Sequence, residues 1–247
     1  MKKWLMILLC VYVLTGCGGG GGGGSSSNTV DGASVTGLWS GTVTGDNGQV
    51  TQVFGVASAN NELRLLSDDL TLQYAGTVSI RGTSGSGTLR GYAVDGVFYN
   101  GEPVTNFSVT FTVVERESIT GTYTTEGDSG RFTLTYEPGA ERQSSLLDLA
   151  GEWGYSYLGQ WAYAVVTNEG VLQTTFDSGC EVNGSITLPS YDWAIYRASV
   201  TVTSCAELDG SYTGLAFLDP DSHEEDVLWL MLSNNSFSYM DGFVRLP

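Results

Sequence analysis

The sequence predicts an all-β protein made of two tandem small antiparallel β-barrel-like domains, with about seven or eight strands each and very little helix. Three observations predict this. Apolar and polar residues alternate in short runs rich in Thr, Val, Tyr and Ser, turn-forming residues separate these runs, and a motif recurs in each half of the chain. Alternation is typical of a half-buried strand, and short turns join antiparallel neighbours.

The N-terminus combines two lysines, Lys2 and Lys3, with an apolar run and the tetrapeptide Leu14-Thr15-Gly16-Cys17. The apolar run is much shorter than the roughly 20 residues that a membrane-spanning helix needs, so we expect a signal peptide. The tetrapeptide resembles the lipobox of bacterial lipoproteins. The resemblance implies that residues 1–16 are removed and that Cys17 carries a diacylglyceryl group and fatty acids such as palmitate, which anchor the protein to a membrane.

A glycine- and serine-rich segment follows the lipobox and is expected to form a flexible tether over residues 17–34. The residue after the lipidated cysteine is Gly18, whereas an aspartate at this position typically retains lipoproteins at the inner membrane. The resemblance therefore implies the outer membrane. It leaves open whether the protein faces the periplasm or the cell surface.

The charge of the mature chain is strongly acidic. Both lysines lie in the leader, so eight arginines remain against 27 acids, a formal charge near −19. Nucleic-acid binding is excluded because no basic stripe can neutralise phosphates. The simplest expectation is a solvated acidic surface.

Two parts of the chain repeat each other. Gly37-Leu-Trp39 opens the first half as Gly151-Glu-Trp153 opens the second, and Ile119–Thr124 matches Leu208–Thr213. A repeat of this length indicates two copies of one unit. We expect a first domain over 35–137, a linker over 138–148 and a second domain over 149–247.

The Gly-x-Trp opening followed by hairpins is similar to the start of lipocalin and avidin-like barrels, in which the tryptophan plugs one end. Closure into a barrel removes exposed sheet edges, as does folding into a sandwich. An immunoglobulin-like sandwich is the alternative. It is less favoured because Cys180 and Cys205 are too close in sequence for the disulfide of that fold.

Of the four cysteines, Cys10 lies in the expected signal peptide and Cys17 is the expected lipidation site. Cys180 and Cys205 remain. In an exported protein such a pair predicts a disulfide. A structural zinc site would need four ligands, and the chain has one histidine, His223.

Residues able to carry catalysis are scarce. His223 lies in the acidic stretch 219–226, which reads as a solvated loop, although its carboxylates raise the alternative of a Ca²⁺ site. Asp128 and Asp177 each begin an Asp-Ser-Gly tripeptide, the pattern of aspartic proteases, but we interpret both as turns. The glycine-rich stretch 82–87 is interpreted as a hairpin loop. We therefore predict no enzyme, no catalytic residue, no metal and no cofactor.

Aromatic residues of the second copy are the clearest candidates for a ligand site. They recur at strand spacing, so each set should lie on one face of the sheet. They either fill the barrel or form a stacking surface for a glycan or a protein partner. The candidate ligand-facing residues are Tyr155, Tyr157, Trp161, Tyr163 and Trp193.

The function predicted from these observations is that of an outer-membrane-anchored, non-enzymatic binding or interaction module of the bacterial envelope. Its partners would be the membrane, through the lipid, and a protein or glycan ligand. One alternative is a structural envelope lipoprotein without a ligand. A less favoured one is an enzyme that uses carboxylates alone, such as a glycosidase.

Overall fold

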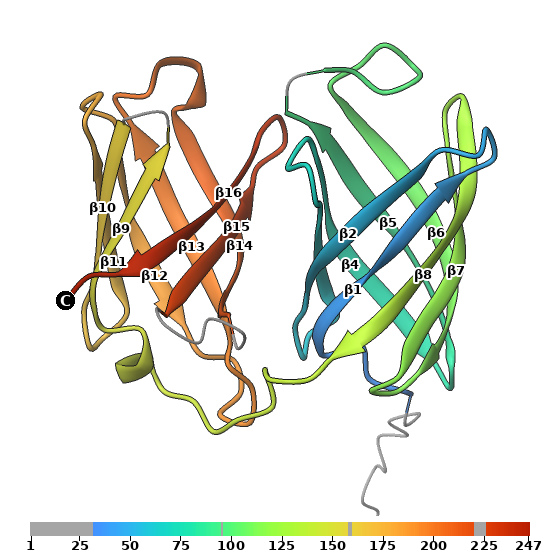
Figure 1. Ribbon diagram of the computed structural model, residues 1–247, viewed down its shortest axis with the longest axis horizontal. Coiled ribbons are helices and arrows are strands. Elements are labelled where there is room, and N and C mark those ends of the chain that lie inside the picture. Colours follow the sequence, from blue (N-terminus) through green and yellow to red (C-terminus); the bar gives the residue numbers. More distant parts are fainter. Residues whose placement is uncertain (1–31, 95, 158–159, 220–225) are drawn as a thin grey trace, which may run out of the picture. The chain divides into compact units, whose positions relative to one another are not determined.

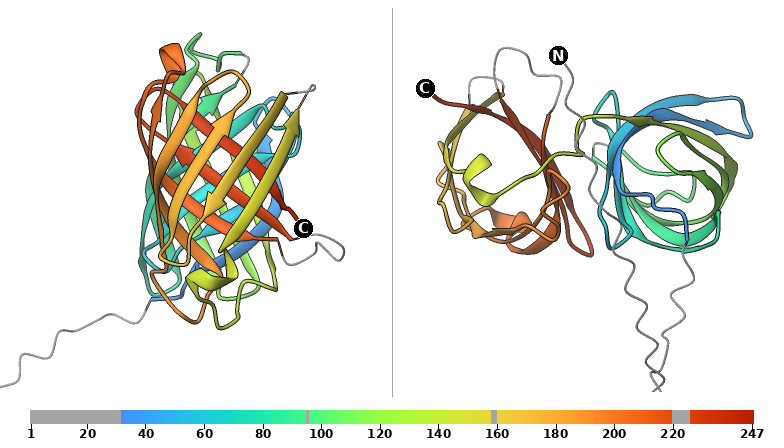
Figure 2. Two further views of the ribbon diagram at one scale, coloured as in Figure 1. Left: turned by 90° about the vertical axis from the view of Figure 1, so that its left-hand side faces the viewer. Right: turned by 90° about the horizontal axis from the view of Figure 1, so that it is seen from below.

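The computed structural model describes residues 32–94, 96–157, 160–219 and 226–247, and its strands close into two antiparallel barrels (Figures 1 and 2). The first barrel comprises β1 (Gly37–Gly45), β2 (Val50–Ala57), β3 (Glu62–Ser67), β4 (Leu72–Arg81), β5 (Ser84–Ala93), β6 (Val104–Val114), β7 (Ser118–Thr125) and β8 (Asp128–Glu137). The second comprises β9 (Gly151–Tyr157), β10 (Gln160–Val166), β11 (Val171–Phe176), β12 (Glu181–Thr187), β13 (Ile195–Thr203), β14 (Gly210–Leu218), β15 (Val227–Ser233) and β16 (Ser238–Arg245).

Each strand pairs with the next along the chain, and the first and last strands of each half pair to close the ring. The prediction of two small antiparallel barrels is thus confirmed, and barrels rather than sandwiches are formed. In the part of the chain that the structure describes, helix is restricted to two short 3-10 turns, η1 (Leu146–Asp148) and η2 (Ala206–Leu208). Among the described residues, no helix has the length and apolar character needed to cross a bilayer.

The Gly-x-Trp motif plays the same role in both barrels. Trp39 and Trp153 are almost fully buried, and each indole N–H donates to the backbone carbonyl four residues earlier, at 2.7 Å and 2.9 Å. Gly37 and Gly151 both have a φ of +138°, which a residue with a Cβ rarely adopts. The glycine is therefore needed to turn the chain so that the tryptophan can enter the end of the barrel.

The second motif of the repeat does not occupy equivalent strands, so this part of the predicted correspondence is wrong. Ile119–Thr124 lies on β7, the seventh strand of its barrel, whereas Leu208–Thr213 runs into β14, the sixth strand of the other. Tyr123 and Tyr212 are both buried tyrosines two residues after a glycine. The motif thus marks an inward tyrosine on a strand rather than one particular strand.

Burial along the strands shows which faces are covered. In β6 every second residue is buried, as expected for a strand with one face in the core and one in solvent. In β3 all six residues are buried. The difference arises because the outer faces of some strands from the two barrels pack together. This shared cluster contains Leu38, Val56, Leu66, Ala140, Ile195, Leu215, Phe217 and Met231.

A buried arginine lies within this shared surface. The Arg64 guanidinium is 2.7 Å from the carboxylate of Glu62, and it donates to the backbone carbonyl of Thr213 at 3.0 Å and to the hydroxyl of Ser233. Both charged side chains are about nine-tenths buried, at 9% and 11% exposed. The arginine therefore joins β3 of the first barrel to β14 and β15 of the second.

The segments predicted as a tether and a linker are partly fixed to the barrels. The amide N–H of Ala33 donates to the carbonyl of Gly82 at 2.7 Å, so the chain is held from that residue onward. In the connection between the barrels, Ala140 is buried and its carbonyl accepts from the amide of Ala194 at 2.8 Å. Segment η1 then leads into the second barrel.

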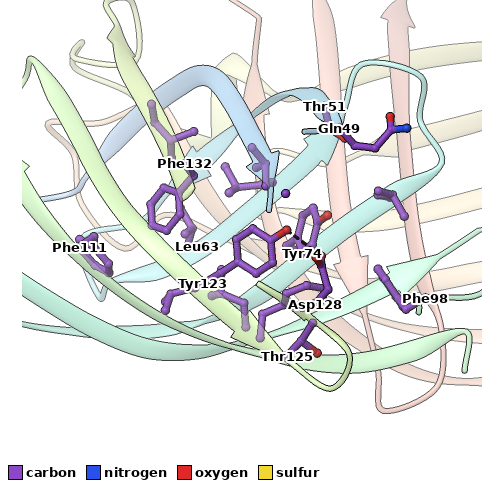
Figure 3. A pocket seen from close by; sticks show the side chains of 18 of the residues that line it. Gln49, Thr51, Leu63, Tyr74, Phe98, Phe111, Tyr123, Thr125, Asp128 and Phe132 are labelled. Carbon is purple, nitrogen blue, oxygen red and sulfur yellow. Dashed lines mark hydrogen bonds between the residues drawn. The ribbon is translucent and has the colours of Figure 1, made fainter. Parts of the chain in front are cut away.

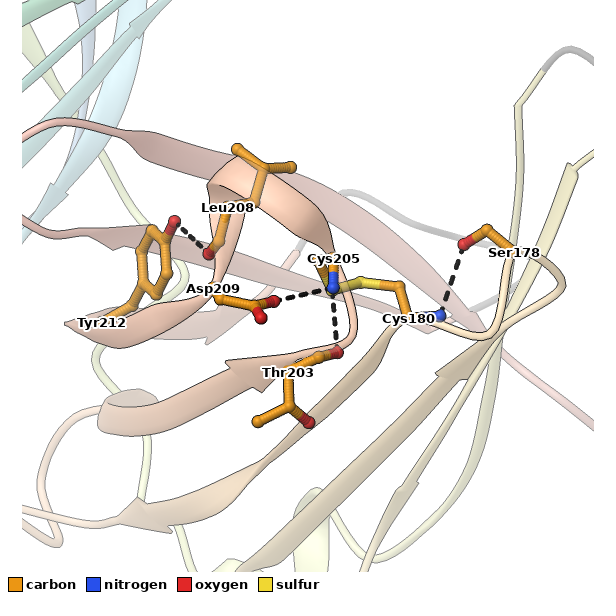
Figure 4. Close-up of a disulfide and its surroundings, with 7 residues drawn as sticks. All are labelled: Ser178, Cys180, Thr203, Cys205, Leu208, Asp209 and Tyr212. Atoms are coloured by element: carbon orange, nitrogen blue, oxygen red, sulfur yellow. Dashed lines mark hydrogen bonds between the residues drawn. A yellow bond between two sulfur atoms is a disulfide. The ribbon is translucent and has the colours of Figure 1, made fainter.

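The predicted disulfide between Cys180 and Cys205 is present, with a Cα–Cα distance of 4.8 Å (Figure 4). It links the turn between β11 and β12 to the segment that follows β13. The amide of Cys205 also donates to the carboxylate of Asp209 at 2.7 Å. The two cysteines are 25 residues apart in sequence, and closing a loop of this size is expected to stabilise the fold by roughly 3–3.5 kcal/mol.

Candidate functional site

The first barrel contains a cavity of about 340 Å³. It extends from the turns at one end of the barrel toward Val35, which packs with the core at the end plugged by Trp39. Its walls come from inward residues of all eight strands. Those deep in the barrel are Val43, Leu63, Leu65, Val78, Leu89, Val109, Phe111, Ile119, Phe132 and Leu134.

An aromatic cluster forms one wall of the cavity. Phe107 on β6 contacts three rings edge-on: Tyr74 on β4 at a centroid distance of 5.2 Å, Phe98 at 5.4 Å, and Tyr123 on β7 at 5.7 Å. Edge-to-face pairs of this kind stabilise an aromatic cluster beyond simple burial. The rings therefore form a preformed surface, and four aromatic side chains border the same space.

One carboxylate lies at this wall. The hydroxyl of Tyr123 donates to Asp128 Oδ2 at 2.7 Å, and Figure 3 shows Tyr74 beside this pair. Burial, with smaller contributions from Asp128 and Asp69, raises the pKa of Tyr74 to about 12. Burial likewise raises the pKa of Tyr123, and the hydrogen bond to Asp128 adds to the shift. Both phenols therefore keep their protons at neutral pH.

The turns between strands border the open end. Asn47, between β1 and β2, donates through its side-chain amide to the hydroxyl of Tyr99, which belongs to the connection between β5 and β6. In that connection Phe98 packs against the aromatic wall, while Val97 and Tyr99 are 62% and 64% exposed. The connection therefore brings apolar side chains to the mouth of the cavity, where a ligand would enter.

Asp128 occupies a different position from the one predicted. The turn lies at Glu126 and Gly127, where Gly127 has a φ of +85°, and Asp128 already pairs with Thr125 as the first residue of β8. The predicted hairpin exists, but the Asp-Ser-Gly tripeptide begins a strand. This register turns Asp128 toward the cavity, which the polar composition of the segment alone did not indicate.

The five aromatic residues predicted to face a ligand lie in different surroundings. Tyr155 is inside the second barrel, with its ring 5.8 Å from that of Phe243. Tyr163 lies on the outer face and is 50% exposed, because Ala162 takes the inward position opposite Tyr155. Trp193 packs beside the shared cluster, with the Arg116 guanidinium 5.7 Å from its ring centroid.

The side chains of Tyr157 and Trp161 lie outside the described residues, as do Cys17 with its lipobox and His223 with most of its acidic stretch. At the edges of that stretch, Asp226 is described and pairs with Arg245 at 2.8 Å. The described members of the aromatic set do not meet at one place. The cavity found here lies in the first barrel, although the sequence favoured the second.

Sequence reasoning missed the cavity because its aromatic rings come from separate strands. Tyr74, Phe107 and Tyr123 are far apart along the chain and form no local motif. The available signal was the strand phase: Trp39 points inward, and the clean alternation from Phe107 to Phe111 marks further inward positions. Assigning inward and outward positions to every strand in this way would have predicted that Tyr74, Phe107 and Tyr123 share the interior of one barrel.

No protein-family model matches the chain, and no curated protein matches it. Among solved structures, a candidate outer membrane protein from Bacteroides fragilis NCTC 9343 is similar, with 10% identity, a TM-score of 0.29, and coverage of 86% of this chain and 98% of that chain.

Proposed function

We propose that this protein is a lipid-anchored, non-enzymatic binding protein of the bacterial outer membrane, and that its first barrel encloses a small molecule with an apolar body. The observation that carries the proposal is the cavity of about 340 Å³, which falls in the range of small-molecule sites in proteins. Its lining is mainly aliphatic and aromatic, with a few polar groups near one wall. That combination favours binding of a ligand with an apolar body.

The lining also supports binding rather than catalysis. Among the described residues that line it, the ionisable groups are Asp128 and the phenols of Tyr74, Tyr99 and Tyr123. A single carboxylate cannot supply the pair of carboxylates that a glycosidase uses. The phenols near Asp128 are weak acids here, because burial and the carboxylate hold their protons.

Binding is tested with N-phenyl-1-naphthylamine, a neutral probe whose fluorescence rises in apolar surroundings, and the mature chain 17–247 with Cys17→Ser produced without lipid. We expect saturable fluorescence enhancement. Val109→Trp should reduce it at least tenfold, because Val109 is 5% exposed and lines the cavity, so an indole there takes the space of the ligand.

The matched control is Thr110→Trp, which places the same indole on the exposed outer face of β6. It should bind the probe as the unmodified protein does. If Val109→Trp does not fold, Val109→Phe gives a smaller obstruction of the same site. Equal binding by the folded Val109 variant and the unmodified protein would exclude the cavity as the site, and absence of any saturable binding would favour a purely structural envelope protein.

The anchoring part of the proposal rests on the lipobox-like sequence. Replacing Cys17 by alanine removes the sulfur that would accept the lipid. We expect the variant to leave the membrane fraction and the unmodified protein to remain in it after a high-salt wash. A variant that stays with the membrane would show that the cysteine is not the anchor.

A further inference from the structure

The cavity of the first barrel holds a negative charge beside aromatic rings. Asp128 lies in the lining next to Tyr74 and Tyr123, and both rings contact Phe107 edge-on. The Tyr123 hydroxyl fixes one carboxylate oxygen at 2.7 Å. The acid is therefore held in a defined orientation at the aromatic wall.

No positive side chain balances this charge within the part of the chain that the structure describes. The lining contains no arginine, lysine or histidine. The described ion pairs join Arg64 and Arg197 to Glu62, and Arg245 to Asp226, all away from the cavity. A positively charged ligand would supply the counter-charge that the lining lacks.

The surroundings of the carboxylate favour one class of cation. Organic ammonium groups are attracted to the faces of aromatic rings and donate charge-assisted hydrogen bonds to carboxylates. The remaining lining is aliphatic, so it would hold an apolar body attached to that group. A metal ion would find a single carboxylate here, which is fewer ligands than such ions require.

Acidic residues at the mouth of the cavity also favour a positively charged ligand. The turns around the open end carry Asp46, Asp69 and Glu126, and the residues described in these turns include no basic side chain. A group of like charges at the entrance attracts ligands of opposite charge and repels anions. Entry of a fatty acid or another organic carboxylate would therefore be disfavoured.

We infer that the ligand of the first barrel is a small organic cation, with an ammonium group at Asp128 and an apolar body in the barrel interior. This inference rests on the proposed binding function and specifies the chemical class of its ligand. Asp128 is the residue that determines the specificity. Tyr123 positions its carboxylate, and the aromatic cluster contacts the cationic end of the ligand.

Three probes with the same ring system test the inference: 1-naphthylmethylamine, 1-naphthalenemethanol and 1-naphthylacetic acid. Their affinities for the lipid-free mature chain 17–247 with Cys17→Ser are measured by calorimetry at neutral pH, where the amine is protonated and the acid ionised. We expect the amine to bind at least about tenfold more tightly than the alcohol, as a hydrogen bond to a charged group predicts, and the acid to bind most weakly.

Asp128→Asn removes the charge with little change in shape and should bring the amine to within about threefold of the alcohol. The control Glu117→Gln removes an exposed charge at the opposite end of the barrel and should keep the preference of the unmodified protein. If Asp128→Asn does not fold, the order of the three affinities measured with the unmodified protein still tests whether the ligand is a cation.

The outcomes separate the two proposals. Binding of the alcohol as tightly as the amine, or an amine preference that persists in folded Asp128→Asn, would overturn the assignment of a cationic ligand while leaving a cavity that binds apolar molecules. Failure of all three probes, together with failure of the neutral naphthylamine probe, would remove the binding function itself.

Discussion

Replacing Arg64 by methionine should lower the free energy of unfolding by about 3–5 kcal/mol, because it leaves a buried carboxylate without its closest partner. The Arg64 guanidinium lies 2.7 Å from Glu62 and also satisfies the carbonyl of Thr213 and the hydroxyl of Ser233 in the other barrel. Arg197 is 3.6 Å from the same carboxylate but is half exposed, so it replaces little of the lost interaction.

Denaturant unfolding followed by fluorescence measures this change. Arg90→Met is the matched control, since Arg90 also reaches the second barrel, donating to the side chain of Asn235 at 2.7 Å, but is only half-buried and makes this contact at an exposed position. An exposed contact of this kind contributes about 1 kcal/mol or less. Similar destabilisation by the two substitutions would contradict the importance assigned to the buried arginine.

A second substitution identifies the cause of the Arg64 effect. If the loss comes from the uncompensated charge of Glu62, adding Glu62→Gln to Arg64→Met should restore part of the stability, because the neutral amide is less costly to bury. Continued loss in the double variant would instead assign the effect to the contacts that the arginine makes with Thr213 and Ser233.

Trp153→Ala should also cost about 3–5 kcal/mol of folding free energy, because it removes a large, fully buried side chain from the core of the second barrel. The expected loss includes the hydrogen bond from the indole N–H to the carbonyl of Leu149 at 2.9 Å. It also includes the contact with Arg245, whose guanidinium carbon lies 4.2 Å from the ring centroid.

The position of Trp153 adds to the destabilisation expected from the loss of a buried side chain. Strands β9 and β16 close the second barrel through two residue pairs, and Arg245 pairs directly with Trp153. The same arginine donates to the carbonyl of Ala150 at 2.9 Å. Removing the ring therefore weakens the shortest strand pairing of the barrel as well as its core.

Thermal and denaturant unfolding of Trp153→Ala, Trp153→Phe and Tyr163→Ala distinguish these contributions. Phenylalanine keeps part of the packing and should give an intermediate loss. Tyr163 is half exposed on the outer face of the same barrel, so its truncation should change stability by about 0.5 kcal/mol or less. A loss at Trp153 no greater than that at Tyr163 would be inconsistent with a tryptophan that holds the barrel end.

The architecture could be predicted because its signals are local. Alternation from Phe107 to Val113 sets the phase of one strand, and the turn residues between strands set the hairpins. The recurrence of Gly-x-Trp at residues 37–39 and 151–153 marks the first strand of each barrel, and the shared φ of +138° shows why the glycine is kept. The disulfide followed from the pairing rule for two cysteines in an exported chain.

The candidate site could not be predicted in the same way. Alternation shows that Phe107, Val109 and Phe111 share a face, but it does not show how much space remains between inward side chains of opposite strands. That space depends on the volumes of side chains brought together from all eight strands. The register between β7 and β8 matters in the same way, because pairing shifted by one residue would turn Asp128 from the cavity to the solvent.

The sequence by itself determined that this protein is all-β, that its body is doubled and that its cysteines pair, because strand phase, turn chemistry and residue counts are properties of short segments. Only the tertiary structure decided that the first barrel encloses a cavity, that Asp128 meets Tyr123 there, and that Arg64 joins the barrels. These features depend on contacts between residues distant in the chain, and the closure and register that bring them together arise only when all the strands have paired.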